Sequence, residues 1–210
     1  MTSHSTGLRP DSRRGSSKSQ CKLTAAQRGK NGKHLQGVVT LTTRLHRRFL
    51  GPLWPEEPKV DGGVFDTVTL SGSARRTLTQ QLTAPGIWRS GPLFGSVHDD
   101  VLHIQVAAPN GYRHWNNPVL DGNPEYQLGW ADALQVLDLP QLEWMGNWIL
   151  RPDNSPLSFS ECEFWLREGQ TSGLFDDSAL LLSCGLLDGY LAVQPYVLSD
   201  NQVKILSVDK

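Results

Sequence analysis

Apolar residues fill the segment from Trp144 to Leu150 with little alternation, as expected for a strand that is covered on both faces of a sheet. Arg151-Pro152 interrupts this run, and a segment rich in Pro, Asn and Ser follows. Ser160 comes next with Glu163 three residues later, a spacing typical of a capping box at a helix N-terminus. The pattern therefore predicts a buried strand, a turn and a Ser-capped helix between residues 143 and 167.

Further strands and helices are predicted on either side of this unit from the period of the apolar residues. Strands are predicted at 64–70, 87–94, 101–106, 179–184, 190–194 and 203–207, and helices at 74–82 and 125–137. Ser71 or Ser73 can cap the first of these helices, and Asp188-Gly189 is typical of a hairpin turn. The run from Val38 to Leu50 fits either a short strand or an amphipathic helix. Together the elements predict an α/β (α+β) fold with a mixed central β-sheet flanked by helices.

Charge is divided unevenly along the chain, although the formal net charge of all 210 residues is only −1. The first 50 residues carry 11 Lys and Arg against 1 acidic residue, which leaves 9 basic and 20 acidic residues for the remainder. Residues 1 to about 33 are rich in Ser, Gly, Lys and Arg, a composition typical of disorder. A Pro-rich linker follows at 51–58. The predicted organisation is a disordered basic tail and linker at 1–58 and a folded domain at 59–210.

The basic tail fits three interpretations. It can be a solvated extension, a segment that binds nucleic acid non-specifically through residues 1–50, or an Arg/Ser-rich targeting peptide. No apolar run reaches the length of a membrane span, so no membrane partner is expected. A soluble domain in the cytoplasm is predicted.

Gly146, Trp148 and Pro152 match a known motif in the predicted strand–turn–helix unit. The unit resembles the JAMM family of zinc isopeptidases, also called MPN or JAB, in its prokaryotic JAB-like form. In that family the strand ends in Gly-x-x-His-x-His-Pro and a Ser-x-x-Asp opens the next helix, the two His and the Asp being the zinc ligands. Ile149 and Arg151 stand at the two histidine positions here. The resemblance implies an MPN/JAB-like mixed sheet flanked by helices.

A second segment, Trp88 to Gly95, is similar to the family's Glu-Thr-Gly-Gly-x-Leu-x-Gly segment. The Glu of that segment is the general base that activates the zinc-bound water, and Trp88 takes its place here. Two pairs can correspond to the Ser-x-x-Asp of the family: Ser160 with Glu163, or, in an alternative register, Ser158 with Glu161.

The chemistry of these positions argues against catalysis by the family's mechanism. Zinc is held by His, Cys, Asp or Glu, whereas Ile149 has no lone pair and Arg151 is a permanent cation. Trp88 has only an N–H donor and cannot accept a proton from water. The resemblance therefore predicts an inactive relative with no metal and no cofactor. The alternative is an active peptidase whose zinc ligands are displaced, for example onto His98, His103 or His114.

Arg151 suggests a more specific hypothesis about the lost metal site. If Glu161 or Glu163 still points into the former pocket, the guanidinium can replace the charge of the zinc ion. The alternative is that Arg151 and both carboxylates lie in solvent.

Other candidate residues lie outside these motifs. Tyr112, Arg113, His114 and Trp115 belong to a polar loop that can bind a partner, although a packed surface loop is the more frequent case. Cys21, Cys162 and Cys184 are widely spaced and indicate neither a disulfide framework nor a zinc ribbon. For Cys162 a packed thiol is favoured over a nucleophile.

Two classes of function follow. The first is a pseudo-isopeptidase that acts as a protein-interaction module for a ubiquitin-like protein, a peptide tail or an active paralogue, with oligomerisation possible. The second is a metal-dependent isopeptidase or peptidase with displaced ligands. Tethering to nucleic acid through residues 1–50 is a third, weaker alternative.

Overall fold

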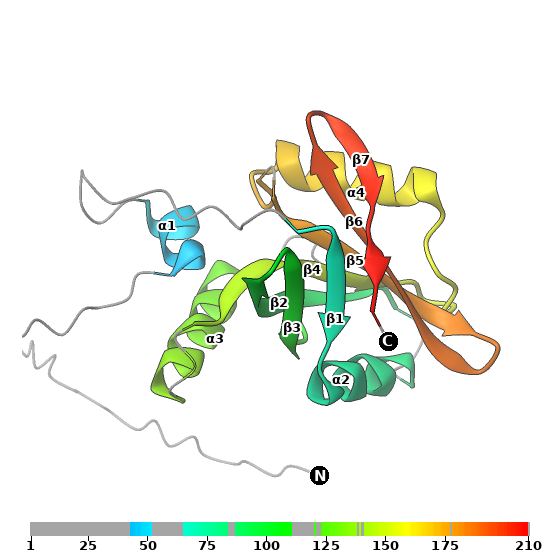
Figure 1. The fold of residues 1–210 in the computed structure, drawn as a ribbon, viewed down its shortest axis with the longest axis horizontal. Helices are drawn as coiled ribbons and strands as arrows, with labels where there is room; N and C mark the ends of the chain where they lie inside the picture. The colour runs from blue at the N-terminus through cyan, green and yellow to red at the C-terminus, as the bar shows by residue number, and fades with distance from the viewer. Residues whose placement is uncertain are drawn as a thin grey trace, which may run out of the picture. The chain divides into compact units, whose positions relative to one another are not determined.

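The computed structural model describes residues 43–51, 65–83, 87–110, 120, 123–137, 139, 141–176 and 178–209. The helices in this part of the chain are α1 (Arg44–Leu50), α2 (Gly72–Leu82), α3 (Pro124–Val136) and α4 (Phe159–Thr171). The strands are β1 (Thr67–Leu70), β2 (Arg89–His98), β3 (Val101–Ala107), β4 (Glu143–Leu150), β5 (Leu180–Leu187), β6 (Tyr190–Ser199), β7 (Gln202–Ile205) and β8 (Ser207–Val208). All of them belong to one compact unit, Thr40–Lys210, drawn in Figure 1.

The strands form one mixed, eight-stranded sheet in the order β7-β6-β5-β4-β2-β3-β1-β8. The pairs β4–β5, β1–β3 and β1–β8 are parallel, and the other pairs are antiparallel. Only Leu206 separates the edge strands β7 and β8, and its N–H donates to the carbonyl of Pro195 at 3.1 Å. The sheet therefore curls into a nearly closed, barrel-like form. The predicted mixed sheet with flanking helices is confirmed at this level.

Each face of the sheet is covered by its own set of apolar side chains, which explains why its central strands lack alternation. On one face, Leu45 of α1, Leu134 of α3 and Leu166 of α4 join a cluster that includes Trp144 and Ile149. On the other face, α2 contributes Ala74 and Leu78 to a second cluster. Every residue of β4 after Glu143 is buried.

Gly146 lies in a β-bulge that changes which residues of β4 face which cluster. The register between β2 and β4 shifts at Leu93/Phe94, which pair with Gly146 and Trp144 and leave Met145 as the extra residue. Gly146 has φ +142°, and a Cβ there would lie 1.9 Å from the carbonyl oxygen of Leu180. Beyond the bulge, Ile149 faces the cluster that contains α4. The bulge thus determines which face of the sheet the side chain of Ile149, a residue of the candidate site, lies on.

The segment whose type the sequence left undecided forms the helix α1. Thr43 caps it by accepting from the N–H of His46, and Leu45 is 0% exposed. Residues 43–51, which the predicted boundary assigns to the tail and linker, thus pack within the folded unit. Positions 1–42 and 52–58 lie outside the described residues.

The last predicted strand, 203–207, is in fact two strands. β7 ends at Ile205 and β8 begins at Ser207, because the chain leaves the edge next to β6 at Leu206 and joins β1 at the opposite edge. Within the described part of the chain, no helix has the length and apolar character needed to span a membrane.

Candidate functional site

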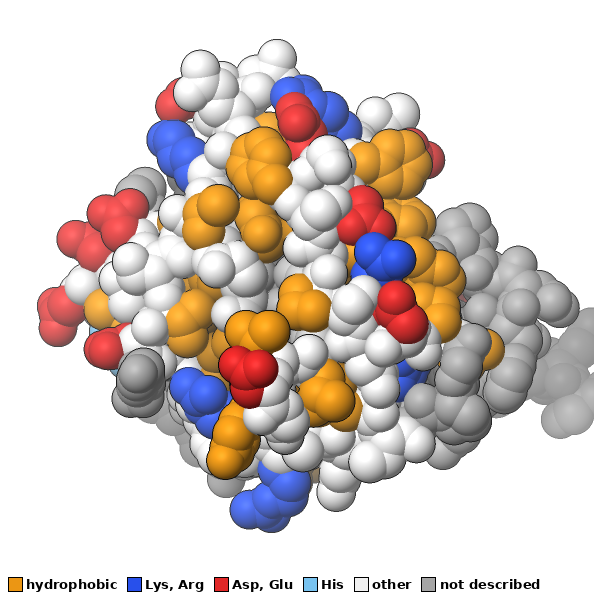
Figure 2. Space-filling view, turned by 90° about the vertical axis from the view of Figure 1, so that its right-hand side faces the viewer, with side chains coloured by type: hydrophobic (Ala, Val, Ile, Leu, Met, Phe, Trp, Pro, Cys, Tyr) orange, Lys and Arg blue, Asp and Glu red, His pale blue; other side chains and the backbone are white. Residues whose placement is uncertain are grey.

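The predicted site residues gather where β2 begins and β4 ends, two antiparallel neighbours in the middle of the sheet. Arg89 pairs with Leu150 and Ser90 with Ile149, so Trp88 and Arg151 are the next residues along this pair of strands. The loop 151–158 then leads to α4. Figure 2 views the unit from the side on which this loop runs in Figure 1, and hydrophobic, acidic and basic side chains intermingle there.

Arg151 forms an ion pair with Glu161 of α4. Its Nη1 lies 2.9 Å from Oε1 of Glu161, and its Nε lies 3.4 Å from Oδ1 of Asp153. The side chains of Arg151 and Glu161 are 32% and 35% exposed, so the pair is half-buried. The N–H and hydroxyl of Ser158, followed by the charge of Arg151, hold the pKa of Glu161 below its usual range. Arg151 is thus paired with a carboxylate, that of Glu161, but both side chains are about one-third exposed, and their place in a former metal pocket stays a hypothesis.

The helix that carries Glu161 starts two residues earlier than predicted, at a different capping box. Ser158 is the N-cap: its hydroxyl accepts from the N–H of Glu161, and Oε2 of Glu161 accepts from the N–H of Ser158 at 2.9 Å. The predicted cap at Ser160 is therefore wrong, and the capping box is formed by Ser158 and Glu161. Leu157, the residue before this cap, is 5% exposed, and its N–H donates to Ser183 Oγ at 3.0 Å. These contacts fix the chain just before Ser158 and so favour Ser158 over Ser160 as the N-cap. Glu163 instead accepts from Arg167 at 2.8 Å on the exposed side of the helix.

Apolar side chains take the other two positions of the resemblance, Ile149 and Trp88. Ile149 is 0% exposed within the cluster beneath α4, and Trp88 packs against the same cluster. The ring centroids of Trp88 and Trp165 are 5.7 Å apart in an edge-on arrangement, and those of Trp165 and Phe164 are 5.1 Å apart. The start of β2 is thus joined to α4 through aromatic contacts.

Arg89 and Asn154 hold the loop 151–158 in place, and neither was predicted as a site residue. Arg89 is buried, and its guanidinium donates to the carbonyls of Gln81 and Arg151 and to Oδ1 of Asn154. Asn154, at φ +62°, donates from Nδ2 to the carbonyl of Leu82 at 2.9 Å, and its own carbonyl accepts from Leu186. The sequence carries a signal only for Asn154, since Asn tolerates the left-handed conformation.

A buried polar group lies under the first turn of α4. Cys162 is 0% exposed, and burial raises the pKa of its thiol to about 11 despite hydrogen bonds with the side chains of Tyr196 and Ser183. Nucleophilic chemistry needs the thiolate, which this environment disfavours. Cys162 is therefore a packed thiol, as the sequence favoured. Cys184 is also buried, and Cys21 lies outside the described residues.

Two of the histidines considered for a displaced metal site, His98 and His103, have other contacts. His103 Nδ1 lies 2.7 Å from the hydroxyl of Thr69, and the His98 and His103 rings are 6.0 Å apart at the β2–β3 hairpin. In the described ranges, no group of three or more His, Cys, Asp and Glu side chains is arranged to hold a metal ion. The positions that correspond to the family's zinc ligands are Ile149, Arg151 and Glu161, and of these only Glu161 has an atom that can bind zinc. These residues do not fit a zinc ion. The predicted binding residues Tyr112, Arg113, His114 and Trp115 lie outside the described residues.

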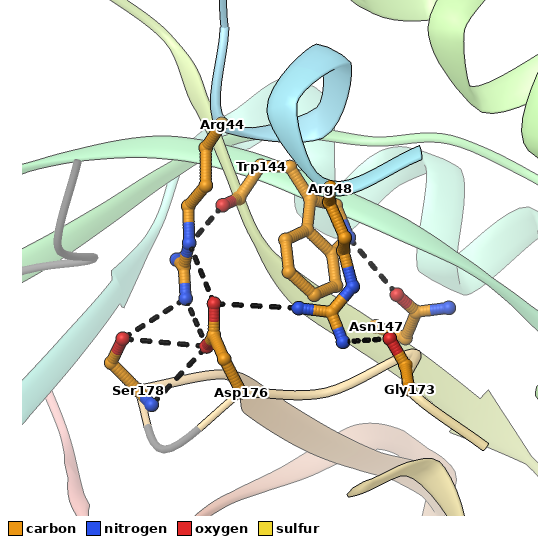
Figure 3. A network of polar contacts seen from close by, with 7 residues as sticks. All are labelled: Arg44, Arg48, Trp144, Asn147, Gly173, Asp176 and Ser178. Atoms are coloured by element: carbon orange, nitrogen blue, oxygen red, sulfur yellow. Dashed lines mark hydrogen bonds and ion pairs between the residues drawn. The ribbon is translucent and has the colours of Figure 1, made fainter. Parts of the chain in front are cut away.

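A second polar centre, which sequence reasoning missed, fastens α1 to the sheet (Figure 3). The guanidinium of Arg44 is paired with Asp176 and donates to the carbonyl of Trp144 at 3.1 Å and to Ser178 Oγ at 3.0 Å. Arg44 and Arg48 each lie 5.1 Å from the centroid of the Trp144 ring. Burial alone would raise the pKa of Asp176, but the hydrogen bonds and charge of Arg44, together with Arg48, hold it below its usual range.

Comparisons with known proteins identify a structural likeness only. No family model matches the sequence, and none of the curated proteins matches it. The fold is similar to the solution structure of protein DSY2949 from Desulfitobacterium hafniense, with a TM-score of 0.51 and 16% sequence identity. The match covers 68% of this chain and 91% of that one. At this level of identity the likeness supports the fold alone.

Proposed function

We propose that this domain is a catalytically inactive relative of the JAB/MPN isopeptidases that acts as a protein-interaction module. The resemblance rests on Gly146, Trp148 and Pro152 in one segment and on the Trp88–Gly95 segment in another. The partner class expected from it is a ubiquitin-like protein, a peptide tail or an active paralogue. A location in the cytoplasm stays a prediction.

The observation that carries the proposal is the ion pair of Arg151 and Glu161. Under the resemblance these two residues correspond to a zinc-binding His and the zinc-binding Asp. A guanidinium 2.9 Å from the carboxylate supplies the positive charge that a metal ion would supply. The third ligand position holds Ile149, which has no donor atom, and the general-base position holds Trp88, which cannot accept a proton.

One exposed and two partly buried aromatic side chains, two of them on the helix that carries Glu161, offer a surface for a partner. Phe164 is 56% exposed and contacts Trp165, which contacts the half-buried Trp88. Aromatic residues are enriched where protein partners bind, because they bury a large area with few rotatable bonds. We name Trp88, Phe164 and Trp165 the aromatic surface.

Restoring the ligands tests the inactive-site part of the proposal. The variant with Trp88→Glu, Ile149→His and Arg151→His is expected to retain one zinc ion per chain after dialysis, measured by metal analysis. The matched control carries Trp88→Glu with Ile149→Ala and Arg151→Ala and is expected to retain none. Wild-type protein that keeps stoichiometric zinc, or that cleaves a modifier–peptide fusion in a chelator-sensitive way, contradicts the proposal and favours displaced ligands.

A binding experiment tests the interaction part. A ubiquitin-like protein is titrated into isotope-labelled domain, and amide shifts are followed by NMR. Phe164→Asp is expected to weaken binding about tenfold or more, since a buried interface aromatic contributes at least 1–2 kcal/mol. Phe159→Asp is the control, because Phe159 is 47% exposed on the same helix but contacts Tyr196 instead of Trp165. Equal loss in both variants would count against the aromatic surface.

A further inference from the structure

α1 is held in place by parts of the chain that lie far from it in the sequence. Outside the helix and its cap, the hydrogen-bond partners described for Arg44, His46 and Arg48 are 86 to 134 positions away. They belong to α3, to β4 and to the segment 173–178. We name four of these partners the α1 seat: Asp132, Glu143, Trp144 and Asp176. The seat is therefore built by a part of the chain that α1 does not adjoin.

Two carboxylates of the α1 seat bind the first turn of α1. The N–H of Arg44 donates to Oε2 of Glu143 at 2.8 Å, and Nε2 of His46 lies 3.0 Å from Oδ1 of Asp132. Leu45, between these two residues, is 0% exposed within the cluster that contains Trp144. The seat thus fits a basic helix that has an apolar residue in its first turn.

The aromatic ring of the α1 seat receives two guanidinium groups (Figure 3). Arg44 and Arg48 both lie over the ring of Trp144, and both are paired with Asp176. Residues four positions apart lie on the same face of a helix, which brings the two arginines to one carboxylate. The seat is therefore specific for the arrangement of charges along α1.

α1 depends on this docking for its helical structure. It has 7 residues, whereas isolated helices shorter than about 12 residues are marginal in water. Its side toward α4 is not closely packed, because a pocket of about 550 Å³ lies there, lined in part by Phe49, Trp165 and Glu168. A short helix that is held at one seat, without close packing on every side, is suited to exchange between identical chains.

We propose that α1 exchanges between two copies of this chain, so that α1 of each copy docks in the α1 seat of the other. The contacts of α1 are the same in the exchanged pair, because the seat of the second copy is identical. A segment tethered beside its own seat has an effective concentration on the order of 1 mM, so the exchanged pair is expected to form with a Kd of about 1 mM. This proposal does not rest on the proposed function of the Arg151 region.

The test mixes two full-length variants, both with Cys21→Ser, and joins their thiols briefly with a short bismaleimide. One variant carries His46→Cys and the other Asp132→Cys, at side chains that lie 3.0 Å apart in the docked helix. Cys162 and Cys184 are buried and do not compete. Exchanged pairs are expected to hold about 2% of the chains at about 10 μM and about half of them at about 1 mM. The product that links the two variants is therefore expected to rise about 25-fold over this range.

Two controls accompany this mixture. In the first, Asp188→Cys replaces Asp132→Cys, because Asp188 is exposed at the β5–β6 turn and reports random collisions alone. This mixture is expected to yield about one-tenth of the linked product or less at about 1 mM, because it lacks the effective concentration that docking supplies. In the second, one chain carries both His46→Cys and Asp132→Cys, and it is expected to link internally at about 10 μM.

Three results would overturn the proposal: equal product in the Asp132→Cys and Asp188→Cys mixtures, no linked pair at about 1 mM, or no internal link in the doubly substituted chain. The second result would show that α1 stays with its own chain, and the third that it does not occupy the seat. Because the aromatic surface is tested with Phe164→Asp and a protein partner, either proposal can fail without the other.

Discussion

Two arginine–carboxylate pairs of this unit differ in burial and in the separation of their residues, which is 132 positions for Arg44 and Asp176 and 10 for Arg151 and Glu161. The side chain of Arg44 is 5% exposed and that of its partner Asp176 39%, whereas Arg151 and Glu161 are 32% and 35% exposed. Arg44 also donates to a carbonyl and a hydroxyl, and lies over the Trp144 ring. Among the described residues, the guanidinium of Arg151 is paired with the carboxylates of Asp153 and Glu161. The first pair is therefore built into the fold, while the second is accessible from solvent and suited to a site.

The largest expected effect is the loss of Arg44. Arg44→Met removes a buried cation together with its bonds to Asp176, Ser178 and the carbonyl of Trp144 and leaves Asp176 with Arg48 as its cation, so the free energy of unfolding is expected to fall by about 3 kcal/mol. Denaturant titration measures this change. The control is Arg167→Met, which breaks a surface pair between residues four apart and is expected to cost about 0.5 kcal/mol or less. Similar losses in the two variants would show that burial does not distinguish the pairs.

A smaller effect is expected at Arg151 and Glu161. In a double-mutant cycle with Arg151→Met and Glu161→Gln, the coupling energy is expected to be at most about 1 kcal/mol, because solvent screens a half-exposed pair. Gln at position 161 preserves the reach of the side chain toward the N–H of Ser158, which limits the loss of the helix cap. Denaturant midpoints of the four proteins provide the coupling energy. A coupling energy near 3 kcal/mol would show that this pair stabilises the fold as strongly as the Arg44 pair is expected to, and would contradict the difference between them.

The smallest expected effect is in the pH dependence of stability. Burial raises the pKa of Asp176, but Arg44 and Arg48 lower it by more, so the pKa in the folded protein is below the usual value. Its contribution is therefore present above the ordinary aspartate pKa of about 3.9 and is lost as the pH falls through the lowered value. Between about pH 5 and pH 3 the free energy of unfolding is expected to fall by about 0.5 kcal/mol less in Asp176→Asn than in the wild type. The difference is small because the carboxylate is partly exposed.

The measurement is a series of denaturant titrations across this pH range, with Glu161→Gln as the comparison. Glu161 also has a lowered pKa, chiefly through the N–H of Ser158. Its loss of stability on acidification therefore has the same sign as that of Asp176. A profile for Asp176→Asn as steep as that of the wild type would contradict the lowered pKa of Asp176.

Local sequence patterns determined most of the secondary structure of the described residues. The two-faced burial of β4 follows from its unbroken apolar run, and the cap of α2 at Ser71 follows from a polar residue before a helical pattern. The Asp188-Gly189 turn joins β5 and β6 as predicted. These features depend on residues within a few positions of one another, which a linear pattern records. The JAB/MPN resemblance and the function derived from it stay predictions.

Tertiary contacts decided the rest, because they join residues that no local pattern relates. Arg44 and Asp176 are 132 positions apart, and their pairing fastens α1 to the rest of the fold. Ser158 and Ser160 have the same capping spacing, and the burial of Leu157 against Ser183 selects Ser158. Likewise, the pocket around Trp165 and Glu168 exists only because α1, α3 and α4 meet over one face of the sheet.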